Sequence, residues 1–188
     1  PCLDISRNAE TKQLLVGGLS DSHLNYVLER VKNIFGIAVD ITAPKIQYRE
    51  TVKKEATAPG RYIKQSGGSG FYGVVEMKFG PSGSDKNVFE ETVFGGAVPK
   101  NYFPAVEKGF IESTEHGLLA GCPVIGIKAV LLDGKYHPVD SNELAFKMAS
   151  IIAFKDAYMN CGPTLQEPIM KITERVGNEF TGNIMNDL

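Results

Sequence analysis

The residue with the most chemical potential in this chain is His137, which stands in the run Tyr136-His-Pro-Val-Asp-Ser-Asn-Glu-Leu-Ala-Phe146. A neutral imidazole donates and accepts hydrogen bonds, and its cationic form pairs with phosphate. Asp140 could orient this imidazole as a catalytic partner, but we find no nucleophile for such a pair in the same motif. We therefore predict that Asp140 or Ser141 caps a helix, with Glu143 at capping-box spacing from Asp140.

A second candidate is the glycine-rich run Gln65-Ser-Gly-Gly-Ser-Gly-Phe-Tyr-Gly73. Its glycines permit positive φ and expose backbone N–H groups, which can cradle a phosphate. A nucleotide-binding P-loop would need Gly-x-x-x-x-Gly-Lys-Ser/Thr, and the sequence contains no such run. Three interpretations stay open: a nucleotide phosphate cradle, a plain flexible hairpin, or a loop that contacts RNA, with Phe71 and Tyr72 available to stack on bases.

Other polar residues are less informative. Lys100 is a candidate phosphate contact, or equally a solvated lysine beside a helix start. The three histidines are too scattered to indicate a metal site. Because the three cysteines show no Cys-x-x-Cys spacing, we predict reduced structural thiols rather than a disulfide framework or a zinc site.

Strand–helix units are predicted to position these residues. Residues 121–132 are predicted to form a strand that ends in an Asp133-Gly134 turn, and residues 141–160 a helix. Upstream, residues 72–79 alternate as a strand, and Pro104 begins a helix that ends near residue 115. The expected apolar stripe of the 141–160 helix comprises Leu144, Met148, Ile151, Ile152 and Phe154.

The two ends of the chain are predicted to hold further, shorter elements. The N-terminal part is expected to run strand, turn, strand, helix, strand, with the helix capped by Ser20 or Asp21 and ended by Gly36. The tail is expected to hold one strand and one helix start, too little to build a core. Both ends therefore suggest cut domains of a longer protein. Strands are expected at residues 3–6, 13–16 and 37–41 in the N-terminal part, at 45–54 and 60–64 in the middle part, and at 168–173 in the tail, with the tail helix near Asn178.

Composition sets broad limits on function. The chain has 188 residues, 43% hydrophobic and 22% charged, with a formal net charge of −2. That charge argues against a generic nucleic-acid binder, although residues 45–64 carry six basic and two acidic side chains. The sequence contains no apolar run of 18 residues and no signal-peptide pattern, so we expect a cytoplasmic protein without a membrane or DNA partner.

Several motifs together resemble the elongation factor G family of translational GTPases. The run from Asp133 to Phe146 resembles one tip loop of domain IV of that family, and Gln65–Gly73 resembles the other. Residues 94–109 resemble the strand-to-helix corner of domain IV, residues 18–24 the helix start in domain III, and residues 165–170 the entry into domain V. These motifs follow the order of the family across nearly the whole chain.

The resemblance implies an α+β fold in three segments. Residues 1–43 would be a partial ferredoxin-like sandwich, the end of domain III. Residues 44–164 would be domain IV, similar to the second domain of ribosomal protein S-five, with a left-handed βαβ crossover. Residues 165–188 would be the first strand and helix of a second ferredoxin-like domain. Handedness comes from the resemblance alone, because such crossovers are otherwise right-handed.

The resemblance also implies a mechanical role. The tip of domain IV would enter the ribosomal A site on the small subunit, where it would promote GTP-dependent translocation of tRNA and mRNA. The partners would be the decoding region, rRNA and the tRNA–mRNA complex. This stretch would not itself be an enzyme and would hold no cofactor or metal, while GTP and magnesium would bind the G domain of the longer protein. Independently of the resemblance, sheet edges exposed in cut domains could let this stretch self-associate. The implied tip residues are Gln65, Ser66, Gly67, Gly68, Ser69, Gly70, Phe71, Tyr72, Tyr136, His137, Pro138, Val139, Asp140 and Ser141.

Two departures from the family pattern favour an alternative. Ser69 occupies a position that is usually basic or histidine, and Phe71 replaces a common glutamine. These changes fit a ribosome-binding paralogue, such as a protection or recycling factor, without translocase activity. A small-molecule kinase on the same fold would need a carboxylate and a lysine around the glycine loop, which the sequence does not indicate.

Overall fold

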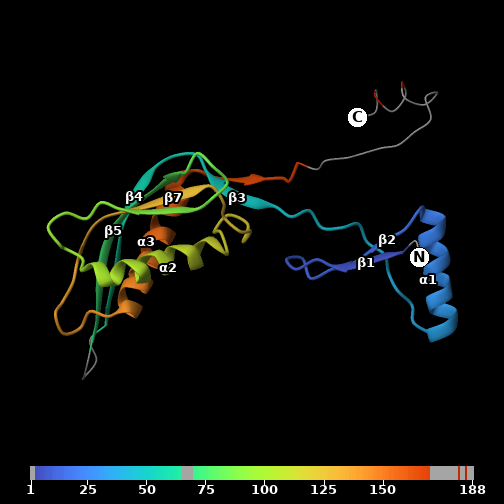
Figure 1. The fold of residues 1–188 in the computed structure, drawn as a ribbon, viewed down its shortest axis with the longest axis horizontal. Coiled ribbons are helices and arrows are strands. Elements are labelled where there is room, and N and C mark those ends of the chain that lie inside the picture. Colours follow the sequence, from blue (N-terminus) through green and yellow to red (C-terminus); the bar gives the residue numbers. More distant parts are fainter. Residues whose placement is uncertain (1–2, 65–69, 170–181, 183–184, 186–188) are drawn as a thin grey trace.

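The computed structural model describes residues 3–64, 70–169, 182 and 185 and has mixed α+β content (Figure 1). Two antiparallel strand pairs and a four-stranded sheet are found in these residues, together with three α-helices. The elements are β1 (Asp4–Arg7), β2 (Leu14–Gly17), α1 (Asp21–Phe35), β3 (Arg49–Val52), β4 (Ala56–Lys64), β5 (Phe71–Pro81), β6 (Val88–Glu91), η1 (Lys100–Tyr102), α2 (Phe103–Thr114), β7 (Ile127–Lys135), α3 (Glu143–Tyr158), η2 (Met159–Cys161) and β8 (Pro163–Gln166).

The N-terminal part consists of a β1–β2 hairpin followed by α1. The Ser20 hydroxyl accepts the His23 N–H and caps the helix, and Gly36 ends it with φ of 66°. Both ends of α1 are thus as predicted. The strand expected at residues 37–41 is wrong, because these residues form neither helix nor strand. Their alternating apolar side chains are exposed beside no partner strand, and a lone strand has no ladder to stabilise it.

The main body is the sheet β4-β5-β7-β6, covered on one face by α2 and α3 (Figure 1). β5 pairs antiparallel with β4 on one side and with β7 on the other. β6 pairs parallel with β7, and the chain between these two strands contains α2. The inward residues of β5 are Val75, Met77 and Phe79, as the alternation predicts. Asp133 and Gly134 do not form the expected turn; they continue β7 and pair with β5 beyond a bulge.

The face of α3 that packs on the sheet differs from the predicted apolar stripe. Phe154 is buried as predicted, but Leu144 is half exposed, and Met148, Ile151 and Ile152 are only partly buried. The buried positions instead repeat a small residue every fourth position, with aromatics beside them. Close approach explains the difference: a Cβ on Gly60 would overlap the Ala149 carbonyl oxygen, and one on Gly73 would lie 2.7 Å from that of Ala145. The buried residues of α3 are Ala145, Phe146, Ala149, Ser150, Ala153, Phe154, Ala157 and Tyr158.

A short strand pair, β3 with β8, joins the body at the end where the chain enters and leaves it. β3 is shorter than the predicted strand at residues 45–54. Pro168 and Ile169 are not in a strand, and the rest of the strand and helix predicted for the tail lies outside the described residues. β8 was not predicted: the sequence suggested a new segment from residue 165, whereas Leu165 and Gln166 pair with Glu50 and Arg49.

Candidate nucleic-acid interface at the sheet tip

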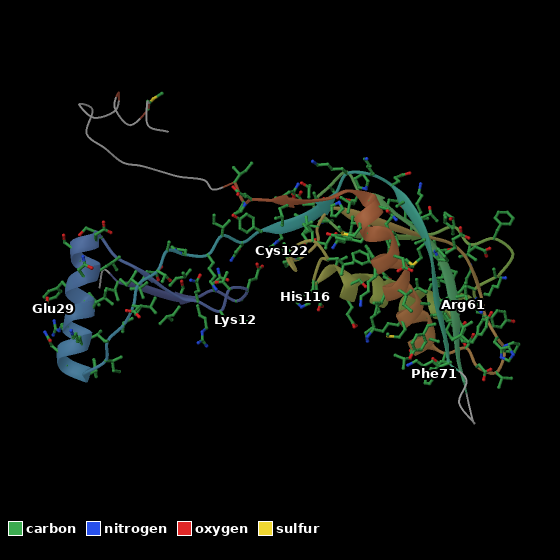
Figure 2. All side chains as sticks on the ribbon, turned by 180° about the vertical axis from the view of Figure 1, so that it is seen from behind. Lys12, Glu29, Arg61, Phe71, His116 and Cys122 are labelled. Carbon is green, nitrogen blue, oxygen red and sulfur yellow. The ribbon has the colours of Figure 1, made fainter. Side chains whose placement is uncertain are left out.

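Two segments distant in sequence meet at one end of the sheet, which we call the tip. One is the β4–β5 hairpin, whose residues 65–69 lie outside the described part of the chain. The other is the loop 136–142 between β7 and α3. Figure 2 shows Phe71 at this end and Cys122 toward the opposite end. The predicted tip residues that the structure describes, 70–72 and 136–141, are therefore neighbours.

Hydrogen bonds hold the two segments together. The Tyr72 N–H donates to the Asp140 carbonyl oxygen at 2.9 Å, and the Ser141 hydroxyl donates to the Tyr72 carbonyl oxygen at 2.8 Å. The Gly70 N–H donates to Asp140 Oδ1 at 3.0 Å. Since two of these bonds involve side chains of the 136–142 loop, its residue types and not only its backbone fix the contact.

His137 lies on the outer side of this loop, with 49% of its side chain exposed. Its Nδ1 lies 3.3 Å from the Val139 nitrogen and 3.2 Å from the Asp140 nitrogen, both of which donate to it. An Nδ1 that accepts these bonds carries no proton, which places the proton of the neutral ring on Nε2. The Tyr72 ring lies beside the imidazole, with centroids 5.9 Å apart. The loop thus presents a hydrogen-bond donor next to an aromatic ring.

Asp140 does not cap α3, so that prediction is wrong. Asn142 is the N-cap, and its side chain accepts the Ala145 N–H at 2.9 Å. Asp140 instead accepts the Gly70 N–H, and its Oδ2 lies 3.4 Å from His137 Nδ1. The Ser141 hydroxyl donates to the Tyr72 carbonyl and is therefore committed to the backbone rather than to the imidazole. This arrangement is that of a folded loop and not of a catalytic triad.

The remaining predicted contacts lie around this loop with different exposures. Phe71 is partly buried and packs edge-on against Tyr62, with ring centroids 6.2 Å apart. Val139 is the most exposed apolar residue of the loop, at 77%. Lys100 is exposed on η1, a helix turn that the structure ties to the tip through Tyr102, whose hydroxyl donates to the Ser141 carbonyl at 3.1 Å. The sequence contained no signal for this role of Tyr102.

Two of the basic residues between 45 and 64 have partners within the chain. Arg49 pairs with Glu10, and Lys64 lies over the Tyr62 ring, 5.3 Å from its centroid. Among the described residues, no three histidine, cysteine, aspartate or glutamate side chains are grouped as they would be to hold a metal ion. In that same part of the chain, no helix is both long and apolar enough to cross a membrane.

The comparison with protein-family models gives two matches, which follow one another along the chain. Residues 1–43 match the model of elongation factor G domain III, and residues 44–162 match that of elongation factor G domain IV. The chain belongs to the elongation factor G family.

Curated relatives agree with this assignment. The chain is 46% identical to elongation factor G of Pseudothermotoga lettingae and 44% identical to that of Fervidobacterium nodosum, in both cases over its whole length. It spans only 28% and 27% of those two elongation factor G sequences. A crystal structure of a protein from Thermus thermophilus superposes with a TM-score of 0.75 at 41% identity, over 87% of this chain and 24% of that one.

Proposed function

We propose that this chain is the part of an elongation factor G-type translation factor whose tip enters the ribosomal A site on the small subunit, where it promotes GTP-dependent translocation of tRNA and mRNA. The observation that carries the proposal is the tip itself, where His137 and Val139 project from a loop hydrogen-bonded to the β4–β5 hairpin. A rigid, protruding loop can occupy space between RNA elements and resist their return.

The partners in this proposal are the decoding region of the small subunit, rRNA and the tRNA–mRNA complex, in the cytoplasm. His137 would offer its Nε2–H to an oxygen acceptor of RNA, with the Tyr72 ring beside it for stacking. GTP and magnesium would bind a G domain of the longer protein, which supplies the hydrolysis. The finer fold features belong to the same proposal: ferredoxin-like domains around an S-five-like domain with a left-handed crossover.

The test is single-turnover mRNA translocation on pre-translocation ribosomes, with the full-length factor and GTP. His137→Ala is expected to slow mRNA movement while leaving ribosome-stimulated GTP turnover and the unfolding midpoint close to wild type, because the side chain is half exposed. The matched control is His116→Ala, an exposed histidine beyond α2 that should change none of the three.

Equal losses of movement, GTP turnover and stability in His137→Ala would contradict a contact role. A second outcome concerns the wild type. Ribosome binding and GTP turnover without mRNA movement would favour the specialised paralogue, a candidate that rests on Ser69 and on Phe71, whose ring packs on Tyr62.

A further inference from the structure

Asp140 is much less exposed than its neighbour His137 at the tip. Its side chain is 16% exposed, compared with 49% for His137. A carboxylate with few water contacts needs hydrogen-bond donors. The donor that the structure supplies from the other tip segment is the Gly70 N–H.

Gly70 and Asp140 are fitted to one another sterically as well. A Cβ added at Gly70 would lie 3.1 Å from Asp140 Cγ and Oδ1, and 3.1 Å from the Lys64 carbonyl oxygen. These distances are tighter than ordinary contacts, so a larger residue would push the carboxylate away. A side chain at position 70 would therefore disturb the contact between Asp140 and the amide.

The charge of Asp140 gives this contact a further meaning. A free carboxylate on a surface that meets RNA would repel the phosphates. Turned toward the Gly70 amide, the carboxylate instead has its charge offset by a backbone dipole within the tip. The link between the two segments is therefore the bond from Gly70, since Oδ2 lies 3.4 Å from Nδ1 of His137 in its own loop and that nitrogen already accepts the Val139 and Asp140 N–H groups.

We propose that Asp140 is a positioning residue of the tip: its carboxylate latches the end of the glycine-rich hairpin to the His137 loop, so that the two loops meet RNA as one unit. The latch rests on the proposed function, because it sets the geometry with which the two loops would make their contacts. Without the Asp140 carboxylate, the two loops would still be joined by the hydrogen bonds of Tyr72, but they would lose the link at Gly70.

The test compares Asp140→Ala with Asp140→Asn in the full-length factor. Asparagine keeps an oxygen that can accept the Gly70 N–H, whereas alanine removes it. Asp140→Ala is expected to slow mRNA translocation about tenfold or more, because small misplacements of contacting groups carry large rate effects. Asp140→Asn should recover most of this loss. The matched control is Asp133→Ala, which removes an exposed aspartate whose carboxylate accepts only the neighbouring Gly134 N–H.

Two further readouts separate positioning from simple stability. In a His137→Ala background, Asp140→Ala should add little further slowing if it acts through His137, and its full effect if the two act independently. Hydrogen exchange of the Gly70 amide should accelerate in Asp140→Ala, and stay slow in Asp140→Asn and Asp133→Ala.

Wild-type rates in both Asp140 variants would overturn the latch, as would full additivity with His137→Ala. A wild-type factor that does not move mRNA would instead contradict the proposed function. In that case the amide exchange decides the latch by itself: unchanged Gly70 exchange in Asp140→Ala refutes it, and faster exchange supports it.

Discussion

The two ends of the main body are the tip and the end where β3 pairs with β8, which we call the base. Both are organised around a carboxylate that accepts N–H groups from another segment, but the two carboxylates differ in how deeply they are buried. At the base, Glu50 of β3 is fully buried and accepts the Leu119, Ala120 and Cys122 N–H groups and the Tyr158 hydroxyl. At the tip, Asp140 accepts one N–H from the partner segment and remains partly exposed. The base joins β3, the α2–β7 connection and α3, and the tip joins two loops.

The electrostatics of Glu50 follow from this setting. Burial by itself would raise the pKa of its carboxyl, but the hydrogen bonds from Tyr158 and the three backbone amides outweigh burial and lower it. Burial, together with the Glu50 charge, raises the pKa of the Tyr158 hydroxyl. The base therefore holds an ionised carboxylate and a protonated phenol. Such an arrangement stabilises the fold, whereas the tip leaves its side chains available for contact.

Removing the base carboxylate should have the largest effect on stability. Glu50→Ala leaves three buried N–H groups and a phenol without their acceptor, and we expect a loss of about 3–5 kcal/mol, similar to breaking a buried ion pair. Glu50→Gln should lose less, since one oxygen acceptor remains. Chemical unfolding of the chain measures both, with the exposed Glu55→Ala as control. A near-wild-type midpoint for Glu50→Ala would show that the base is not a stabilising centre.

Acid unfolding gives a second view of the base. Because the folded pKa of Glu50 lies below its ordinary value of 4.5, its stabilising contribution is present above that pH and is lost as the pH falls through the folded pKa. We expect the stability difference between wild type and Glu50→Gln to shrink as the pH falls below about 4.5. A difference that stays constant down to low pH would contradict an ionised Glu50.

Close packing between the sheet and α3 should give the next largest effect. Gly60→Ala would place a Cβ against the Ala149 carbonyl oxygen, which is backbone and cannot turn aside. We expect a loss of about 2–3 kcal/mol from this overpacking. Gly17→Ala is the control, because a Cβ there would meet only Asp4 atoms at ordinary distances of 3.5 Å or more. Equal stability of the two variants would mean that α3 shifts freely on the sheet.

The same contrast explains what could be predicted from the sequence. The alternation of β5 and both ends of α1 are local patterns, and the structure confirms them. Of the stripe predicted for α3 only Phe154 is buried, because Leu144, Met148, Ile151 and Ile152 lie outside the packed face, where alanines allow the helix to approach Gly60 and Gly73. Hydrophobicity alone does not show which face of a helix must carry small side chains so that it can approach the sheet closely.

The roles of the two carboxylates depend on contacts that are distant in sequence. Asp140 has the right spacing for a cap, but the Asn142 side chain takes that position, which leaves Asp140 free to reach an amide 70 residues away. Glu50 lies in a basic stretch, and its partners are 69 to 108 residues distant. The motifs at the tip could be found by resemblance, whereas the contacts that hold them in place required the fold.

The smallest effect is expected where the N-terminal part contacts the base. Arg49, next to Glu50, binds Glu10 of the β1–β2 turn through both of its terminal nitrogens, at 2.8 and 2.6 Å. This hydrogen bond lowers the pKa of Glu10, so the pair persists at neutral pH, but both side chains are partly exposed and salt should weaken it.

Glu10→Gln should leave the unfolding midpoint nearly unchanged while accelerating proteolysis between residues 36 and 48. High salt should accelerate proteolysis of the wild type similarly, and Glu55→Gln, which weakens the pair with Lys78 of β5, should not. Cleavage rates that are the same in all variants would show that Arg49 anchors only its own strand and does not restrain the N-terminal part.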